Sequence, residues 1–315
     1  MPGNQDQRFL AALIGDGRPL IAFTGLALLM SGVFAFFLSA TKHFLPHDIA
    51  YLGMTAEALC GINECRIVHF MIHDRVSFGG AIAAVGVLYL WLAVFPLQQR
   101  EPWAWWTLVV SGLIGFGSFL SYLGYGYLDT WHGSATAALL PVFLLGMWKL
   151  RTVLPRSGPA SLLASSTSVN LSNWGGRGRF LLIITAASIA LGGFVISVIG
   201  ATSVFVPQDL TYMNITVVEL NAINPRLVSL IAHDRAGFGG GVCCCGVTMF
   251  FCLWCGRWQR SLWDAVAIAG TLGFATAVFI HPVVGYNDAL HLAPAVLGLS
   301  MFAVGIITST PKRRA

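Results

Sequence analysis

The chain has 315 residues, of which 56% are hydrophobic and only 10% charged, with a formal net charge of +5. Soluble globular domains carry about a quarter charged residues, so this composition excludes an ordinary soluble fold and indicates an integral membrane protein. The small positive charge gives no reason to expect nucleic acid as a partner. The sequence also contains no phosphate-binding glycine loop, no G-x-S-x-G and no H-E-x-x-H motif.

Eight apolar runs are about long enough to cross a bilayer as helices, which requires roughly 20 residues each. The runs are continuously apolar and do not alternate, so they predict helices and not barrel strands. The expected fold is therefore that of an all-α integral membrane protein, and the lipid bilayer is an expected partner. The predicted spans are residues 20–40, 76–97, 104–122, 134–150, 180–201, 237–255, 262–281 and 290–308.

The loop after the first span carries a P-x-D motif at 46–48 and a cysteine pair in CGINEC. In an oxidising compartment Cys60 and Cys65 are expected to form a structural disulfide, and a redox-active pair is the alternative. The short helical segment that ends near Glu57 is expected to lie on the outer membrane surface.

The sequence HDRVSFGG, residues 73–80, stands directly before the second predicted span. Ionisable groups at the edge of a hydrocarbon layer are costly and indicate a functional site by default. A structural interpretation is also open, in which Asp74 caps the following helix and Arg75 pairs with it or reaches lipid headgroups. Such a cap does not need a histidine, so His73 is the informative residue of this motif.

A Ser- and Gly-rich linker follows the fourth span, and the chain then repeats itself. HDRVSFGG returns as HDRAGFGG at 233–240, and GYLDTWH returns as GYNDALH at the start of the last span. The predicted domains are a first four-helix half at 1–154, a cytoplasmic linker at 155–179 and a second four-helix half at 180–315. Four spans per half predict two tandem bundles related in parallel, by a pseudo-twofold axis along the membrane normal.

In this topology the histidines and most of the basic residues fall on opposite sides of the membrane. All eight histidines fall at or near one side, whereas thirteen of the 18 basic residues fall on the other. By the positive-inside rule the basic side is the cytoplasm, or the matrix of a mitochondrial inner membrane, and both termini are expected there. The basic residues on that side are Arg8, Arg18, Arg100, Lys149, Arg151, Arg156, Arg177, Arg179, Arg257, Arg260, Lys312, Arg313 and Arg314.

Each half places one histidine at its second span and one at its fourth, near one depth at the outer face. Two imidazoles on facing helices suit a shared metal ion or haem iron. An aspartate stands three residues before each fourth-span histidine, as a further ligand or an orienting carboxylate. The predicted metal ligands are His73, His132, His233, His291, Asp129 and Asp288. The predicted catalytic residues are His73, Asp129 and His132.

The two halves are not equivalent in their histidines. His69 has no histidine counterpart in the second half, and His281 stands where the first half has Tyr122. Such differences are typical of a duplication in which one copy is catalytic and the other is structural or binds a different group.

With these features the chain resembles the heme A synthase family. The shared features are eight spans in two halves, histidines at the outer ends of the even-numbered spans, a cysteine pair in the first outer loop and a basic residue beside the second-span histidine. The resemblance implies a haem b held by His233 and His291, with His73 and His132 marking the site of a reacting porphyrin. It also implies that Arg75 and Arg235 meet propionates, and Asp288 is grouped with this cofactor site.

The sequence therefore predicts a haem- or metal-binding membrane redox protein, with membrane oxidoreductase as the candidate enzyme class and haem b or non-haem iron or zinc at its outer face. A membrane electron donor or other membrane subunits are the expected partners. Two alternatives stay open: a proton- or ion-coupled transporter that uses the acids and histidines as a relay, and a structural or assembly subunit of a membrane complex.

Overall fold

The computed structural model describes residues 14–41, 43–120, 124, 126–127, 130–164 and 169–311. Within these residues the chain is all helical, and eight of its helices are long and apolar enough to cross a membrane. This confirms the all-α prediction and is compatible with a multi-pass membrane protein. The eight helices are α2 (Arg18–Ala40), α5 (Arg66–Val94), α6 (Pro102–Leu120), α7 (Thr130–Val153), α8 (Trp174–Ala201), α11 (Leu227–Cys255), α12 (Arg260–Val284) and α13 (Ala289–Thr308).

Helices α5 and α11 begin ten residues before the starts predicted at 76 and 237, at Arg66 and Leu227. The prediction took the charged HDR triplet as a helix boundary, but the apolar residues before it continue the same helix. Asp74 is therefore not a helix cap, since Cys65 occupies the N-cap position of α5. At about 1.5 Å per residue, His73 lies about 10 Å along the helix axis from Arg66.

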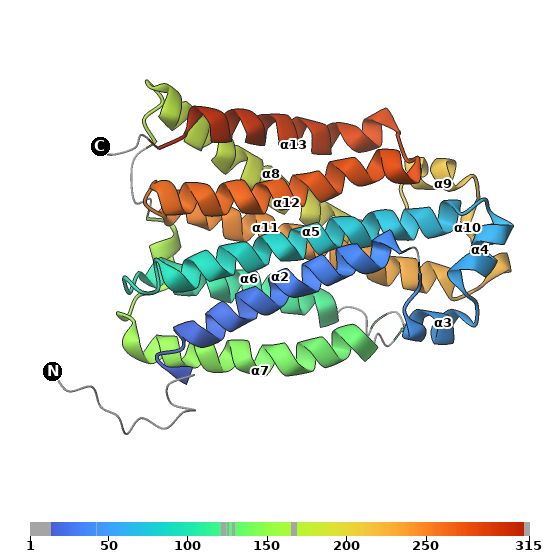
Figure 1. The fold of residues 1–315 in the computed structure, drawn as a ribbon, viewed down its shortest axis with the longest axis horizontal. Helices are drawn as coiled ribbons and strands as arrows, with labels where there is room; N and C mark the ends of the chain where they lie inside the picture. The colour runs from blue at the N-terminus through green and yellow to red at the C-terminus, as the bar shows by residue number, and fades with distance from the viewer. Residues whose placement is uncertain are drawn as a thin grey trace.

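Helices α5 and α11 form the centre of the molecule and pack against each other (Figure 1). Most of their apolar spans is buried, 83% and 72%, against 11–33% for the other six helices. Glycines permit the closest contacts: a Cβ on Gly32 of α2 would lie 2.4 Å from the carbonyl oxygen of Gly79 on α5. Small residues at such crossings are typical of helix packing in membranes, where close backbone approach provides the contact.

The two halves interlock. Helix α12 of the second half packs along α5 of the first, and α6 of the first half packs along α11 of the second. Within each half, α2 packs on α5 and α8 packs on α11. The central helix of each half is therefore packed against a helix of the other half. Two self-contained tandem bundles would not make these contacts.

Four short helices lie at the end of the bundle where α2 and α8 end (Figure 1). They are α3 (Pro46–Leu52), α4 (Ala56–Ile62), α9 (Pro207–Met213) and α10 (Val217–Ile223). Each predicted loop helix is thus a pair of helices. The pairs exchange equivalent hydrogen bonds, because Asn63 donates to the Met213 carbonyl at 3.0 Å and Asn224 donates to the Leu52 carbonyl at 2.7 Å. This reciprocity supports a twofold relation between the halves.

Candidate metal centre

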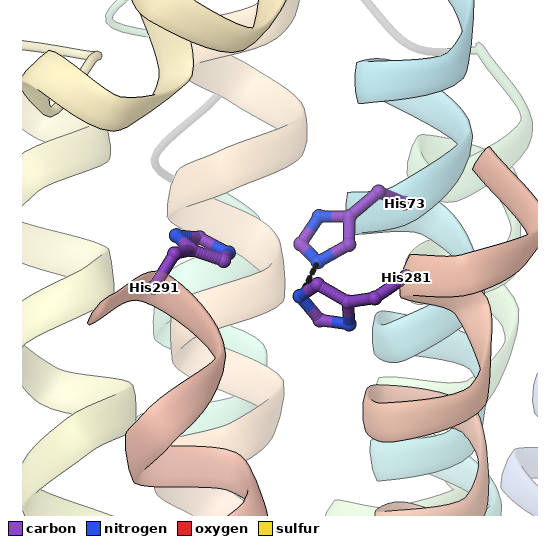
Figure 2. Close-up of side chains that lie close together, drawn as sticks. All are labelled: His73, His281 and His291. Atoms are coloured by element: carbon purple, nitrogen blue, oxygen red, sulfur yellow. Dashed lines mark hydrogen bonds between the residues drawn. The ribbon is translucent and has the colours of Figure 1, made fainter. Parts of the chain in front are cut away.

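Three histidines from three helices meet at the end of the bundle that carries the short helices. His73 of α5, His281 of α12 and His291 of α13 each offer one ring nitrogen, and these atoms lie within 4.8 Å of one another (Figure 2). The Nε2 atoms of His73 and His281 are 3.1 Å apart. His73 and His281 are both 3% exposed and lie inside the protein, whereas His291 is partly buried. We refer to His73, His281 and His291 as the His cluster.

Local sequence places the two second-half histidines beside each other. His281 lies in the last turn of α12, which ends before Gly285 in a left-handed conformation (φ 77°) that glycine adopts without strain. The chain reverses there, and α13 begins four residues later with Asp288 as its N-cap. The Asp288 carboxylate accepts a hydrogen bond from the His291 backbone N–H at 2.8 Å. Asp288 therefore positions His291 through the backbone, as a capping residue.

A carboxylate orients His73. Its Nδ1 lies 3.0 Å from Oδ1 of Asp74, which is 1% exposed. An ionised carboxylate only accepts hydrogen bonds, so the proton of this imidazole resides on Nδ1 and the Nε2 lone pair faces the His cluster. Metal-binding histidines commonly have this arrangement, in which a second group fixes the ring and raises its basicity.

His291 is oriented through a tyrosine. The Tyr286 hydroxyl donates to Oδ1 of Asp209 at 2.7 Å and lies 3.1 Å from Nδ1 of His291. Because the tyrosine has one proton to donate, His291 Nδ1–H is the donor to its oxygen, which leaves Nε2 of His291 free to bind an ion. Burial and the neighbouring Asp209 carboxylate raise the pKa of Tyr286, so the hydroxyl remains protonated.

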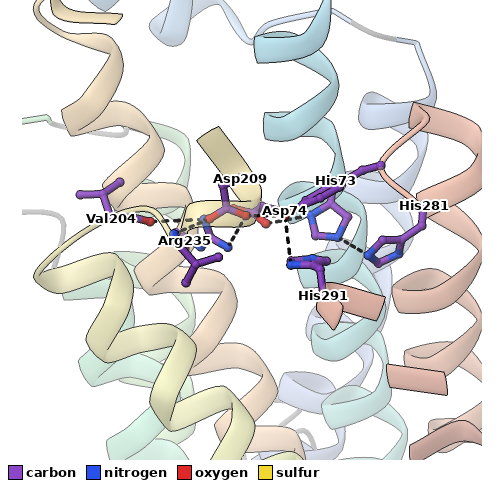
Figure 3. A network of polar contacts seen from close by, with 9 residues as sticks. His73, Asp74, Val204, Asp209, Arg235, His281 and His291 are labelled. Atoms are coloured by element: carbon purple, nitrogen blue, oxygen red, sulfur yellow. Dashed lines mark hydrogen bonds and ion pairs between the residues drawn. The ribbon is translucent and has the colours of Figure 1, made fainter. Parts of the chain in front are cut away.

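An ion pair holds the Asp209 carboxylate, which ends the hydrogen-bond series that runs from His291 through Tyr286. The Arg235 guanidinium contacts both oxygens of Asp209, and it also donates to the Val204 carbonyl at 3.3 Å (Figure 3). Asp209 accepts as well from the backbone N–H of Val206 at 2.8 Å, at the start of α9. Residues 207–209 repeat the P-x-D motif of 46–48, and their aspartate both caps a short helix and pairs with the arginine of the second HDR triplet.

The contact between His73 and His281 has two possible arrangements. Because Nε2 of His73 is an acceptor, the 3.1 Å contact is either a hydrogen bond from Nε2–H of His281 or a pair of lone pairs that face a positive ion. The other nitrogen of His281, Nδ1, is buried and has no hydrogen-bond partner among the described residues. Metal–nitrogen bonds of about 2.0–2.1 Å place two tetrahedral ligand atoms roughly 3.3 Å apart, close to the observed separation.

The His cluster lies in the wall of a cavity of about 720 Å³, which we call the His-cluster cavity. Helices α8, α11, α12 and α13 provide most of its wall, and α5 of the other half contributes His73, Ser77 and Ala81. An ion bound by the three histidines would therefore have one side turned to a space that a small molecule can fill.

A related site lies in the first half, in a second cavity of about 280 Å³, the Asp48 cavity. Arg75 bridges Asp48 at 2.7 Å and Asp234 at 2.8 Å, and the Tyr127 hydroxyl donates to Asp48 at 2.5 Å. Burial opposes ionisation of Asp48, but the Arg75 guanidinium and the Tyr127 hydroxyl together hold its pKa below the ordinary value of 3.8. This arrangement repeats the Arg235–Asp209–Tyr286 network around the twofold relation.

Among the four predicted histidines the ring contacts join opposite halves, whereas the sequence predicted pairs within each half. His73 lies with His291, at 5.5 Å between ring centroids, and His132 lies with His233, at 5.9 Å. The prediction also omitted His281, although its asymmetry with Tyr122 was a usable signal. Asp129 lies outside the described residues.

The remaining predicted residues lie in structural contacts. Arg75 and Arg235 pair with aspartates inside the protein, so these ion pairs already engage the guanidinium groups that were expected to meet propionates. Cys60 and Cys65 are joined by a disulfide.

No protein-family model matches this chain, and comparisons with curated proteins and with solved structures find no match. The resemblance to heme A synthases and the predicted haem at His233 and His291 therefore stay predictions.

Proposed function

We propose that this chain is a multi-pass membrane protein that binds a redox-active transition-metal ion at His73, His281 and His291. The observation that carries the proposal is the 3.1 Å contact between two buried imidazole nitrogens, with the third histidine beside them. Two of the three rings are oriented by a carboxylate, directly in one case and through Tyr286 in the other. This is the environment expected of metal ligands.

The geometry favours a non-haem ion over haem at these three residues. Two histidines on opposite faces of a haem iron, with bonds of about 2.0–2.1 Å, hold their nitrogens about 4 Å apart with a flat macrocycle between them. The His73 and His281 rings are in T-shaped contact, with centroids 4.5 Å apart, which leaves no space for a porphyrin plane. The residues of the His cluster therefore fit a mononuclear ion and do not fit a haem between this pair.

An all-imidazole ligand set suits iron, copper or zinc. Iron or copper would supply one-electron chemistry at this site, whereas zinc would supply only Lewis-acid chemistry. Three protein ligands also leave a coordination position open, which is the usual arrangement of a catalytic site and not of a structural one. In this function Asp74 and Tyr286 would hold the rings of His73 and His291 in the binding tautomer, and Arg235 would hold the Asp209 carboxylate in place beside Tyr286.

The predicted orientation places the His cluster at the outer face, with both termini in the cytoplasm or matrix. A redox site there requires a membrane electron donor or another membrane subunit, and both remain part of the proposal. The same orientation supports the disulfide between Cys60 and Cys65, because the first loop would face the oxidising side.

The test is metal and visible-spectrum analysis of the protein purified in detergent. We expect about one iron or copper ion per chain without a Soret band, and loss of the ion in His281→Ala. His69→Leu, which removes a histidine one turn from His73 and outside the His cluster, is the matched control and should keep the ion. A Soret band that His233→Ala or His291→Ala removes would favour haem instead, and a metal-free protein would reject both.

Proton-coupled transport is the second candidate, and one observation favours it. His73 and Asp74 lie inside a 29-residue helix, in contact with His281, so the ionisable groups extend below the membrane edge. Proton uptake by vesicles containing a metal-free protein would favour this function. A third candidate, a structural or assembly subunit, predicts tight association with a partner and neither metal nor transport.

A further inference from the structure

The His-cluster cavity reaches the lipid-facing surface of the bundle. Its wall includes Leu191 and Val195 of α8 and Leu290 of α13, which are 65%, 46% and 75% exposed. Helices α8 and α13 meet at the opposite end of the bundle, where a Cβ on Gly178 would lie 2.9 Å from the Gly305 carbonyl oxygen. The other end of α8 packs instead on α11, at Gly200. The two helices thus diverge toward the His cluster.

The polar groups of this cavity gather at its histidine end. Arg235 and Gln208 line it together with the three histidines, and its described lining contains no aspartate or glutamate. The Asp48 cavity differs, because Asp48 and Asp234 both line it. A bound metal ion adds positive charge to the His-cluster cavity alone. Its polar end therefore complements an anionic oxygen donor, and the rest of its wall complements an apolar chain.

We propose that the His-cluster cavity binds a single-chain amphiphile with a carboxylate head, which enters from the lipid between α8 and α13. The head occupies the open coordination position at the His cluster, and the chain lies along α8 and α13. This inference rests on the proposed metal site for the placement of the head. The volume of about 720 Å³ falls in the range of about 300–1,000 Å³ that is typical of small-molecule sites.

The probe is a palmitic acid analogue with a diazirine in its chain, photo-crosslinked to the full-length protein in phosphatidylcholine nanodiscs. Adducts are mapped by peptide mass spectrometry with and without excess palmitic acid. We expect adducts concentrated on residues 188–199 and 290–298, reduced at least five-fold by the competitor. Adducts spread evenly over the lipid-facing helices, or unaffected by the competitor, would overturn the proposal.

Two cavity-filling variants make the test independent of folding defects. Gly192 and Gly273 both line the cavity, and a Cβ at either position would meet no other atom within 4 Å. Gly192→Leu and Gly273→Leu should therefore fold and lose most of the competed adducts. Gly117→Leu is the matched control, because Gly117 has equal space and lines neither cavity. Equal labelling in all three variants would contradict the proposal.

A metal-free sample separates this proposal from the metal site. In His281→Ala we expect adducts at the same residues, but with palmitic acid competing at least ten-fold less well, since the head loses its ligand. If the protein binds no metal, the proposed function fails while competed labelling of the cavity still locates an amphiphile. If the protein binds metal but shows no competed labelling, only the amphiphile proposal fails.

Discussion

Nε2 of His73 lies 3.1 Å from Nε2 of His281, although the two residues are 208 positions apart in the chain. The contact joins the central helix of the first half to the seventh span, α12. The third histidine of the cluster, His291, also comes from the second half. The candidate metal centre therefore exists only when the two halves are assembled, and neither half carries it alone.

The carboxylate behind His73 should control metal affinity. Asp74→Asn keeps the size of the side chain but removes the negative acceptor of the His73 Nδ1–H. Loss of such a partner typically costs about 10–100-fold in metal affinity, and we expect a decrease of that order in a competition titration with a chelator. Asp264→Asn, at the half-exposed Arg260–Asp264 pair, is the control. An unchanged affinity in Asp74→Asn would contradict the assigned role.

The two equivalent tyrosines should behave differently. Tyr286 and Tyr127 each donate to a buried aspartate, but Tyr286 also contacts a histidine of the cluster. Tyr286→Phe should lower metal affinity by about ten-fold or more, because His291 loses the group that fixes its tautomer. Tyr127→Phe removes the matching hydrogen bond in the Asp48 cavity and should leave the affinity unchanged. Equal effects of the two substitutions on metal titration would show that the tyrosines act only on stability.

The Arg235–Asp209 ion pair should be important for stability. Arg235 is 5% exposed and Asp209 is fully buried, so Arg235→Met leaves an uncompensated charge inside the protein. Breaking a buried pair from one side costs about 3–5 kcal/mol, which should appear as a large decrease of the thermal midpoint in detergent. The double variant Arg235→Met with Asp209→Leu should recover much of the loss. A single variant as stable as the parent would contradict the burial of this pair.

Asp48 predicts a pH dependence of stability. Its pKa in the folded protein is below the ordinary value of 3.8, so the folded state binds this proton less readily than the unfolded state. The stabilisation is present above pH 3.8 and is lost as the pH falls through the folded pKa. We expect the thermal midpoint to decrease below about pH 4, and to decrease less steeply in Asp48→Asn. An identical acid profile in the variant would contradict the assignment.

The sequence was sufficient to predict the helical class, the eight candidate spans and the repeat, because apolar length and self-similarity are local properties. It misplaced the starts of α5 and α11, since charges inside a buried helix look like a boundary until their partners are known. Arg75 and Arg235 pair with aspartates 27 and 26 residues away, on α3 and α9, and Arg75 also pairs with Asp234 of α11, 159 residues away.

The pairing of the histidines could not be deduced in the same way. A duplicated chain offers the same residue types for contacts within a half and between halves, and only helix packing selects between them. In the structure α12 packs along α5, which brings His281 to His73. The signal that pointed to His281 was its lack of a counterpart, because Tyr122 stands at the equivalent position.

The most direct test of the central claim is the X-ray absorption spectrum of the purified protein at the edge of its bound metal. We predict about three imidazole ligands at roughly 2.0–2.1 Å, and a spectrum that His281→Ala alters but His69→Leu does not. A metal bound through other donors, or a spectrum that is the same in the parent and His281→Ala, would contradict a metal centre built from His73, His281 and His291.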